Sequence, residues 1–233
     1  MLPLEARLDA QLRWYAASIP LAGATVADVG ANVGWLSQFF AEAVGEAGRV
    51  VSIEPLAENV AAIRERIAGL GAQARWTVEA CAVSGRKGSA SLALFRTPEG
   101  DWNSRVVAGK GARKVPARPL SALVPEATVV KLDIEGHEYA VLEEALPRLE
   151  QAHSWAIELH AVPGIPLQQA LGLLMAHGYR VYAGARRTDD TSGTWIGEEI
   201  GAALDWAAVP PTRLRADGTA FKMLHVIARR EAP

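Results

Sequence analysis

The sequence is poor in cysteine, since Cys81 is the only one among 233 residues. A single cysteine cannot form an internal disulfide bond, so we expect a reducing compartment. The first twenty residues carry Glu5 and Asp9 and contain no continuous apolar stretch, which argues against a signal peptide. These absences predict a cytoplasmic globular protein.

Long apolar runs and a large excess of one charge are also missing. No run approaches the roughly 18 apolar residues that span a bilayer, so we expect no membrane-spanning segment. The net charge is −2, and Arg113, Lys114 and Arg118 form only a modest basic cluster. Because nucleic-acid binding normally needs a basic surface, we expect neither nucleic acid nor a membrane as a partner.

What the chain does contain is an alternation of short apolar runs with amphipathic stretches. Its hydrophobic content of 50% is enough for a single domain over residues 1–233 with its own core. Strands separated by helices of about 10–15 residues are typical of a mostly parallel sheet covered on both faces. The expected strands are 24–30, 48–55, 75–83, 89–95, 128–136, 154–160, 179–184 and 221–228, and the expected helices are 4–17, 33–44, 56–70, 137–149 and 165–177.

Three segments stand apart from this alternation. Residues 1–20 carry an apolar stripe at helical spacing and predict an N-terminal helix. Residues 96–114 are polar and predict either a substrate-contacting loop or a solvated hairpin. Residues 184–220 are rich in Gly, Pro, Thr and Asp, and we expect an irregular insertion before the last strand. We expect this insertion to act either as a lid over the site or as a contact between the two chains of a homodimer.

The stretch DVGANVG, which begins at Asp28, lies between an expected strand and an expected helix. Glycine has no Cβ, so Gly30 and Gly34 let the backbone come close to a ligand, and the helix that follows offers unpaired N–H groups. Glu54 ends the second expected strand, where an acid can accept the hydroxyls of a ribose. With Asn32, these residues predict a nucleotide-like cofactor site, although two glycines also suit an ordinary tight turn.

The spacing within this turn discriminates between cofactors. The dinucleotide fingerprint G-x-G-x-x-G requires glycine where this chain has Asn32 and Trp35. An NAD-dependent oxidoreductase is therefore disfavoured. The spacing from Asp28 to Gly34 instead matches the turn D-x-G-x-x-x-G of S-adenosylmethionine enzymes, and an acid at this strand end suits the ammonium group of the ligand.

Four segments extend this similarity in order along the chain. They are DVGANVGWLS (28–37), SIEPLAENV (52–60), EACAVSGRKG (79–88) and VKLDIEGHEYAVLEEA (130–145). On these segments the chain resembles the FkbM-type family of class I S-adenosylmethionine-dependent methyltransferases. The resemblance implies a Rossmann-like α/β fold with a mostly parallel seven-stranded sheet and helices on both faces. It also implies methyl transfer, usually to a hydroxyl of a small molecule, sugar or natural-product scaffold.

The resemblance further implies how the cofactor is bound. The glycine turn would surround the methionine end, and the acid after the second strand would hold the ribose. The segment after the third strand would line the adenine, and the acid of the VKLD segment would lie near the methyl donor. The implied residues are Asp28, Gly30, Asn32 and Gly34 for methionine, Glu54 for ribose, Pro55, Glu79, Ala80 and Cys81 for adenine, and Asp133 for the methyl donor.

A hydroxyl acceptor is weakly nucleophilic, so we expect a general base at the ends of two neighbouring strands. The candidates are Asp133 and Glu135 after one strand and Glu158 and His160, which share one face of the next. Glu135 also suits a helix cap. A divalent ion held by Asp133, Glu158 and His160 is the alternative, but no tight ligand spacing supports it, so no metal is expected.

The function expected from these residues is O-methylation of a hydroxylated small molecule. An N-methyltransferase of the same fold is the first alternative, since an amine needs less help from a base. A non-catalytic S-adenosylmethionine-fold binding protein is the second. The sequence itself does not identify the acceptor.

Overall fold

We describe a computed structural model of the chain. The residues that the structure describes are 14–96, 102–107, 113–160, 167–186, 195–199, 213–214, 220–221 and 223–230.

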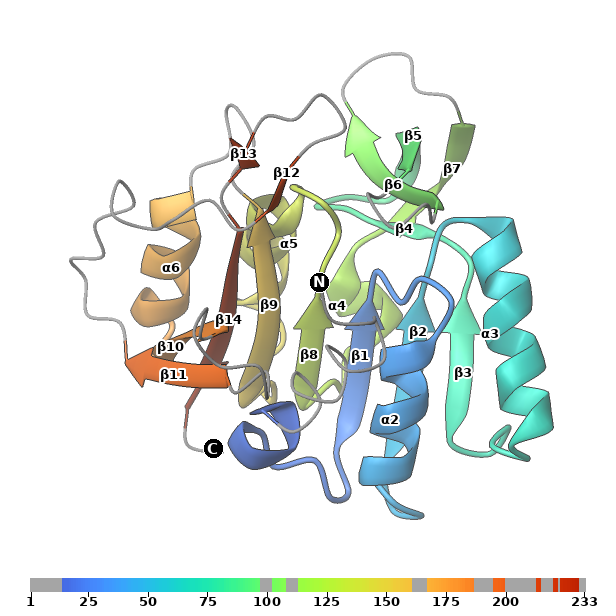
Figure 1. The fold of residues 1–233 in the computed structure, drawn as a ribbon, viewed down its shortest axis with the longest axis horizontal. Coiled ribbons are helices and arrows are strands. Elements are labelled where there is room, and N and C mark those ends of the chain that lie inside the picture. The colour runs from blue at the N-terminus through green and yellow to red at the C-terminus, as the bar shows by residue number, and fades with distance from the viewer. Residues whose placement is uncertain are drawn as a thin grey trace.

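A single large sheet forms the centre of the molecule, with strand order β11-β10-β14-β9-β8-β1-β2-β3 (Figure 1). The neighbours from β3 to β9 pair in parallel, while β14 is antiparallel to both β9 and β10. This confirms the expected mostly parallel α/β fold. The strands are β1 (Thr25–Val29), β2 (Arg49–Ile53), β3 (Trp76–Glu79), β8 (Val129–Leu132), β9 (Ser154–His160), β10 (Arg180–Arg186), β11 (Trp195–Glu199) and β14 (Met223–Arg229).

Seven of these strands correspond to the expected sheet, and β11 adds an eighth, antiparallel to β10 at the edge. The expectation that 184–220 is wholly irregular is therefore wrong, because β11 lies within it. Two short strands, β12 (Arg213–Leu214) and β13 (Ala220–Phe221), also pair with each other in this region. Gly197, Glu198 and Glu199 make up most of β11 and are residue types depleted in strands, and β12 and β13 are only two residues long, so the sequence contained little indication of these pairings.

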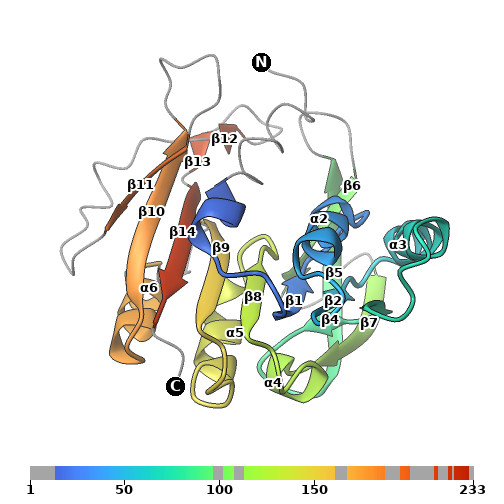
Figure 2. The ribbon, with the colours of Figure 1, turned by 90° about the horizontal axis from the view of Figure 1, so that it is seen from below.

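Helices cover both faces of the large sheet (Figure 2). On one face lie α2 (Trp35–Ala43), α3 (Ala57–Gly69) and a short helical turn at residues 14–18. On the other lie α4 (Leu120–Leu123), α5 (Glu138–Ala145) and α6 (Leu167–Ala176). The turn at 14–18 is the end of the expected N-terminal helix, whose earlier residues lie outside the described part.

Two hydrophobic cores follow from this arrangement, one on each face of the sheet. Tyr15, Phe40 and Ile63 belong to the core beneath α2 and α3. Leu142 and Leu174 belong to the core beneath α5 and α6. Because the strands contribute residues to both cores, their sequences read as continuous apolar runs rather than as alternating ones.

A second, smaller sheet lies above the carboxyl ends of the large sheet, with strand order β4-β7-β5-β6 (Figure 1). It corrects two expectations. The expected strand 75–83 divides into β3 and β4 in different sheets, and 89–95 pairs in the small sheet instead of joining the alternation. Residues 96–114 contain β6 and the start of β7, and the antiparallel pairing of β6 with β5 corresponds to the hairpin that was one of the two expectations for this segment. The strands are β4 (Ala82–Val83), β5 (Gly88–Arg96), β6 (Trp102–Val107) and β7 (Arg113–Arg118).

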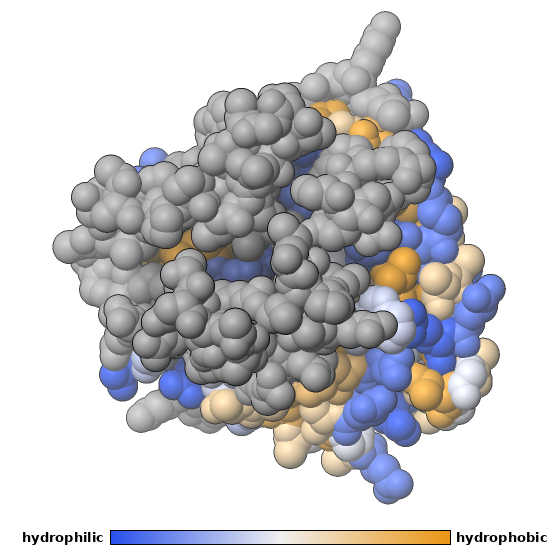
Figure 3. Space-filling view, in the orientation of Figure 1, coloured by the Kyte–Doolittle hydropathy of each residue, from blue (hydrophilic) through white to orange (hydrophobic). Residues whose placement is uncertain are grey.

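The described surface beside α2 and α3 carries interspersed hydrophilic and hydrophobic residues (Figure 3). Among the described residues the exposed large hydrophobic side chains are Trp35 and Leu70. The guanidinium of Arg66 lies 3.5 Å from the ring centroid of Trp35, so one face of this ring is covered. In the described part of the chain, no helix combines the length and apolarity needed to cross a membrane.

Candidate active site

The turn between β1 and α2 requires a left-handed backbone at three positions. The φ angles are +77° at Gly30, 51° at Asn32 and +85° at Gly34. A Cβ on Gly30 would lie 1.8 Å from the carbonyl oxygen of Asp133, which no side chain can tolerate. Gly30 therefore brings the first turn of the sheet into direct contact with the backbone that follows β8.

Glu54 closes this turn from the end of β2. Its Oε2 accepts a hydrogen bond from the backbone N–H of Asn32 (2.9 Å), and its Oε1 accepts one from that of Leu56 (2.9 Å). The amide of Asn59 also donates to Oε1 (3.3 Å). Burial raises the pKa of Glu54 to about 7, although these hydrogen bonds act in the opposite direction. Glu54, the acid that was predicted to bind the ribose, is therefore held against the turn in one orientation.

This raised pKa predicts a pH dependence of stability. Between pH 5 and 7.5 the folded protein keeps a proton on Glu54 that the unfolded chain has lost, so stability falls as pH rises through this window. Glu54→Gln cannot titrate, and we expect wild type to lose about 2 kcal/mol more than the variant across the window. Urea unfolding at several pH values measures this difference.

Glu58→Gln is the matched control for this measurement. Its hydrogen bond with Arg113 lowers the pKa of the exposed Glu58 carboxyl, so this group is ionised across the window in both states. Parallel pH profiles for wild type and Glu54→Gln would contradict the assignment of a protonated Glu54.

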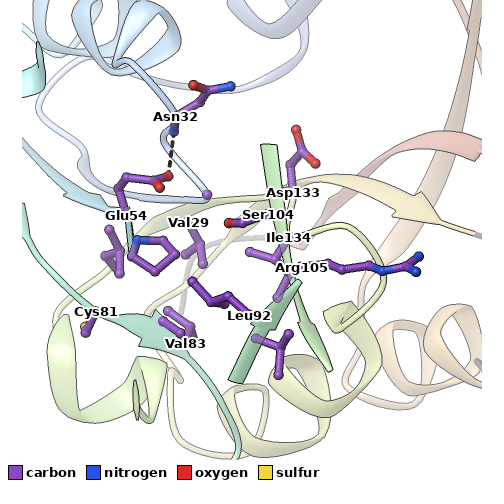
Figure 4. Close-up of a pocket in the computed structure, with 15 residues that line it drawn as sticks. Val29, Asn32, Glu54, Cys81, Val83, Leu92, Ser104, Arg105, Asp133 and Ile134 are labelled. Atoms are coloured by element: carbon purple, nitrogen blue, oxygen red, sulfur yellow. Dashed lines mark hydrogen bonds between the residues drawn. The ribbon is translucent and has the colours of Figure 1, made fainter. Parts of the chain in front are cut away.

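A cavity opens between the ends of β1, β2 and β8 and the small sheet (Figure 4). Its volume is about 60 Å³, below the roughly 300–1,000 Å³ of typical ligand pockets, so it would hold only part of a cofactor. In Figure 4, Asn32 and Glu54 lie on one side and Asp133 lies across from them. Of the residues implied for the cofactor, those that line the cavity are Gly30, Asn32, Glu54, Pro55, Cys81 and Asp133.

The small sheet contributes further lining residues, of which those in β6 belong to the segment 96–114 that was expected either to contact substrate or to form a solvated hairpin. They are Ala82 and Val83 from β4, Leu92 from β5, and Ser104, Arg105 and Val106 from β6. For Leu92 the sequence held a signal, because Ala90, Leu92 and Leu94 alternate with the smaller or polar Ser89, Ser91 and Ala93, and a period of two is typical of a half-covered strand.

The other residues implied for the adenine differ in their surroundings. Ala80 is exposed, and the Glu79 carboxylate forms an ion pair with Arg118 (3.2 Å) outside the cavity lining. Cys81 is buried, and burial raises the pKa of its thiol to about 11, with the charge of Glu79 acting in the same direction. Cys81 is therefore a neutral lining residue, as its expected role requires.

Asp28 lies beneath the turn and not at its surface. It is fully buried, accepts a hydrogen bond from the hydroxyl of Ser37, and has Oδ1 3.6 Å from Nζ of Lys131. Lys131 also lies 3.5 Å from Oδ2 of Asp133 and donates to the carbonyl of Gly30 (3.1 Å). The structure thus assigns Asp28 a partner within the protein, while its expected contact with the ligand ammonium stays a prediction.

Lys131 keeps its charge in this buried position. Burial by itself lowers the pKa of its ammonium, but the carboxylates of Asp133 and Asp28 outweigh burial, and the pKa is raised. Its place two residues before Asp133, on the same face of β8, makes it a buried partner of carboxylates. It therefore links β1 and β8 by charge as well as by backbone pairing.

The four catalytic candidates come together at the ends of β8 and β9. His160 is 1% exposed, and its Nε2 lies 3.3 Å from Glu158 Oε1 and 3.4 Å from Glu135 Oε2. One ligand atom each from Asp133, Glu158 and His160 lies within 4.8 Å of the others. The expected convergence of the two strand ends is confirmed.

Glu138 completes this group, although its place in the first turn of α5 suggests by sequence only an acid at a helix end. It is fully buried, and its Oε1 lies 3.0 Å from Nδ1 of His160. The same oxygen accepts from the backbone N–H groups of Ile134 (3.3 Å) and Gly136 (3.0 Å). Glu138 therefore pairs backbone N–H groups ahead of α5, which is the role that the sequence suggested for Glu135.

The carboxylates set the charge of His160. Burial lowers its pKa, but the hydrogen bonds and charges of Glu138 and Glu158 outweigh burial, and the pKa is raised well above its usual value. His225 is a further neighbour, with Nε2 3.7 Å from Oε2 of Glu158. No sequence signal placed His225 here, because the antiparallel pairing of β14 with β9 sets it opposite Glu158.

Comparisons with known proteins identify the fold and the family. The model of the methyltransferase FkbM domain matches residues 28–181. Among solved structures, methyltransferase FkbM from Methylobacillus flagellatus KT has a TM-score of 0.56 at 19% identity, covering 80% of this chain. This chain spans 46% of that protein's length. No match was found among curated proteins.

Two further structures share the fold. One is a SAM-dependent O-methyltransferase from Thermotoga maritima, with a TM-score of 0.51 at 12% identity. The match covers all of this chain and 67% of that protein. The other is Aeropyrum pernix fibrillarin, solved with natively bound S-adenosyl-L-methionine, with a TM-score of 0.50 at 11% identity. The match covers 84% of this chain and 76% of that protein. The family match spans most of the chain, including the glycine turn, Glu54 and the polar group around His160. The chain therefore belongs to the FkbM family of S-adenosylmethionine-dependent methyltransferases.

Proposed function

We propose that this chain transfers the methyl group of S-adenosylmethionine to a hydroxyl oxygen of a small molecule. The observation that carries this proposal is the convergence of Asp133, Glu158 and His160 beside the glycine turn. A hydroxyl must lose its proton as the oxygen attacks, and positioned acid–base groups assist such transfers by about 10²–10⁴-fold. A site that handled only a neutral amine would need less of this polar machinery.

The cofactor fits the residues around the cavity. When bound, S-adenosylmethionine supplies an activated methyl group. We assign Glu54 to the ribose, because the N–H groups of Asn32 and Leu56 hold its carboxyl toward the turn. Pro55 and Cys81 line the same cavity and suit the adenine, and Asp133 lies on the side of the catalytic group. The remaining task of the protein is to align the acceptor and exclude water.

Turnover of variants tests the proposal. We expect Glu158→Gln and His160→Ala to lower the rate of methyl transfer to hydroxylated acceptors by about 100-fold, while the Kd for S-adenosylmethionine changes by less than about twofold. The reason is that both groups act on the acceptor side of the site. Release of S-adenosylhomocysteine with a panel of alcohols, sugars and matching amines gives the rates, and calorimetric titration gives the affinity.

His177→Ala is the matched control. His177 follows directly after α6, and its Nδ1 is hydrogen-bonded to the carbonyl oxygen of Leu173 (2.9 Å). It should leave both quantities unchanged. Normal rates in Glu158→Gln and His160→Ala with alcohols would remove the acid–base role. Turnover with amines alone would identify an N-methyltransferase, and cofactor binding with no turnover would identify a binding protein.

A further inference from the structure

We propose that Asp133, Glu158 and His160 bind a divalent metal ion, which holds the acceptor hydroxyl. Their ligand atoms lie within 4.8 Å of one another, a separation that a single ion can bridge. Glu158 Oε1 and His160 Nε2 are already 3.3 Å apart. The group lies at the carboxyl ends of β8 and β9, beside the backbone contact between Gly30 and Asp133.

The orientation of His160 supports a ligand role. Its Nδ1 lies 3.0 Å from the fully buried Glu138, so its Nε2 is directed toward Glu158 and Glu135. Metal-binding histidines commonly donate their second ring N–H to a carboxylate, which fixes both the tautomer and the ring plane. Glu138 is itself held by the N–H groups of Ile134 and Gly136. A ligating imidazole must be neutral, so the ion takes the place of the proton on Nε2, which is released to solvent. The chain thus supplies both the ligand and the group that orients it.

The donor set indicates the class of ion. One imidazole with two carboxylates suits first-row divalent ions such as Mn²⁺ better than Ca²⁺, which takes oxygen ligands alone. Three protein ligands leave open positions on an octahedral ion, and an acceptor hydroxyl can occupy one of them. This differs from the absence of a metal expected from sequence spacing, because the three ligands come from two strand ends and no local motif connects them.

The catalytic consequence rests on the proposed function. The acceptor oxygen, bound to the ion, is more acidic than in water. Its O–H bond breaks, and the proton passes to Glu135 or to solvent. The new O–CH₃ bond forms as the bond from methyl carbon to sulfur breaks, and the sulfur leaves as the neutral thioether of S-adenosylhomocysteine. No oxidant or reductant is required.

Metal binding is tested without cofactor or acceptor. Mn²⁺ is titrated into the full chain stripped with EDTA, and the loss of the free-ion signal in electron paramagnetic resonance measures the bound fraction. We expect one ion per chain. We also expect Glu158→Gln and His160→Gln to weaken binding by at least tenfold, and Glu138→Gln by about 10–100-fold through the orientation of His160.

Glu144→Gln is the matched control, because Glu144 is a buried acid of the same helix whose partner is Ser121. Circular dichroism of each variant separates lost binding from lost folding, and the conservative Asp133→Asn provides a third ligand variant. Unchanged Mn²⁺ binding in all ligand variants would place the ion elsewhere and overturn the site.

The outcomes separate this inference from the proposed function. Full alcohol methylation in EDTA with no Mn²⁺ bound would overturn the metal site and leave O-methylation intact. Specific Mn²⁺ binding with no alcohol methylation would support the site and remove the proposed function. If the variants weaken S-adenosylmethionine binding and no Mn²⁺ binds, the negative charge serves the sulfonium of the cofactor, and the metal site is overturned.

Discussion

Gly30→Ala is expected to destabilise the folded protein by about 4 kcal/mol and to weaken S-adenosylmethionine binding at least tenfold. Two effects add. A left-handed backbone at φ +77° is strained for alanine, and the new Cβ would lie 1.8 Å from the carbonyl oxygen of Asp133. To relieve this overlap, β1 or the segment after β8 must move. Because Asn32 and Asp133 line the cavity, this movement also disturbs the cofactor site.

Gly23→Ala separates the two effects. Gly23 also has a positive φ, +72°, but a Cβ there would meet nothing within 4 Å. We expect it to cost only about 1 kcal/mol and to leave cofactor affinity unchanged. Urea unfolding and calorimetric titration provide the measurements. Equal losses of stability in the two variants would contradict the packing role assigned to Gly30.

Lys131→Met is the second substitution with a large expected effect. It should destabilise the protein by about 4 kcal/mol, because it leaves the fully buried Asp28 carboxylate without its nearest cation. The carbonyl of Gly30 loses a hydrogen bond at the same time. Asp133 is partly exposed and can recover water, so most of the loss should come from Asp28. The free energy of unfolding measures it.

The double variant Lys131→Met with Asp28→Asn tests this explanation. Removing both charges leaves no unpaired ion at this position, and the side-chain amide oxygen of the new asparagine can still accept a hydrogen bond from the hydroxyl of Ser37. We expect it to recover at least half of the stability lost in Lys131→Met. Additive losses in the double variant would mean that Lys131 acts through packing and not through charge.

Much of the large sheet could be predicted from sequence. Its central strands are nearly continuous apolar runs ended by Gly, Pro or Asp, and the helices between them carry apolar residues at helical spacing. The small sheet could not, because β6 and β7 are partly exposed and carry several polar residues, while Val106, Val115 and Ala117 supply their contacts to a small apolar cluster. The pairing of such strands depends on partners that their own sequence does not identify.

The site divides in the same way. Parallel strands place their carboxyl ends at one edge, and this rule predicts that Asp133 and Glu158 come close. The role of Glu138 was harder to predict, since an acid in a first helical turn usually faces solvent. Only packing shows that Glu138 is buried against His160. Likewise, the pairing of β14 with β9 brings His225 to Glu158.

The sequence by itself determined the fold class, the family and the strand ends at which the polar residues gather. Hydrophobic periodicity and the order of motifs are local properties of the chain, so they can be read without coordinates. Only the tertiary structure decided that Asp28 is neutralised by Lys131 and that Asp133, Glu158 and His160 share one space with Glu138 behind them. These contacts join residues distant along the chain, and their side-chain directions are set by the packing of strands and helices against one another.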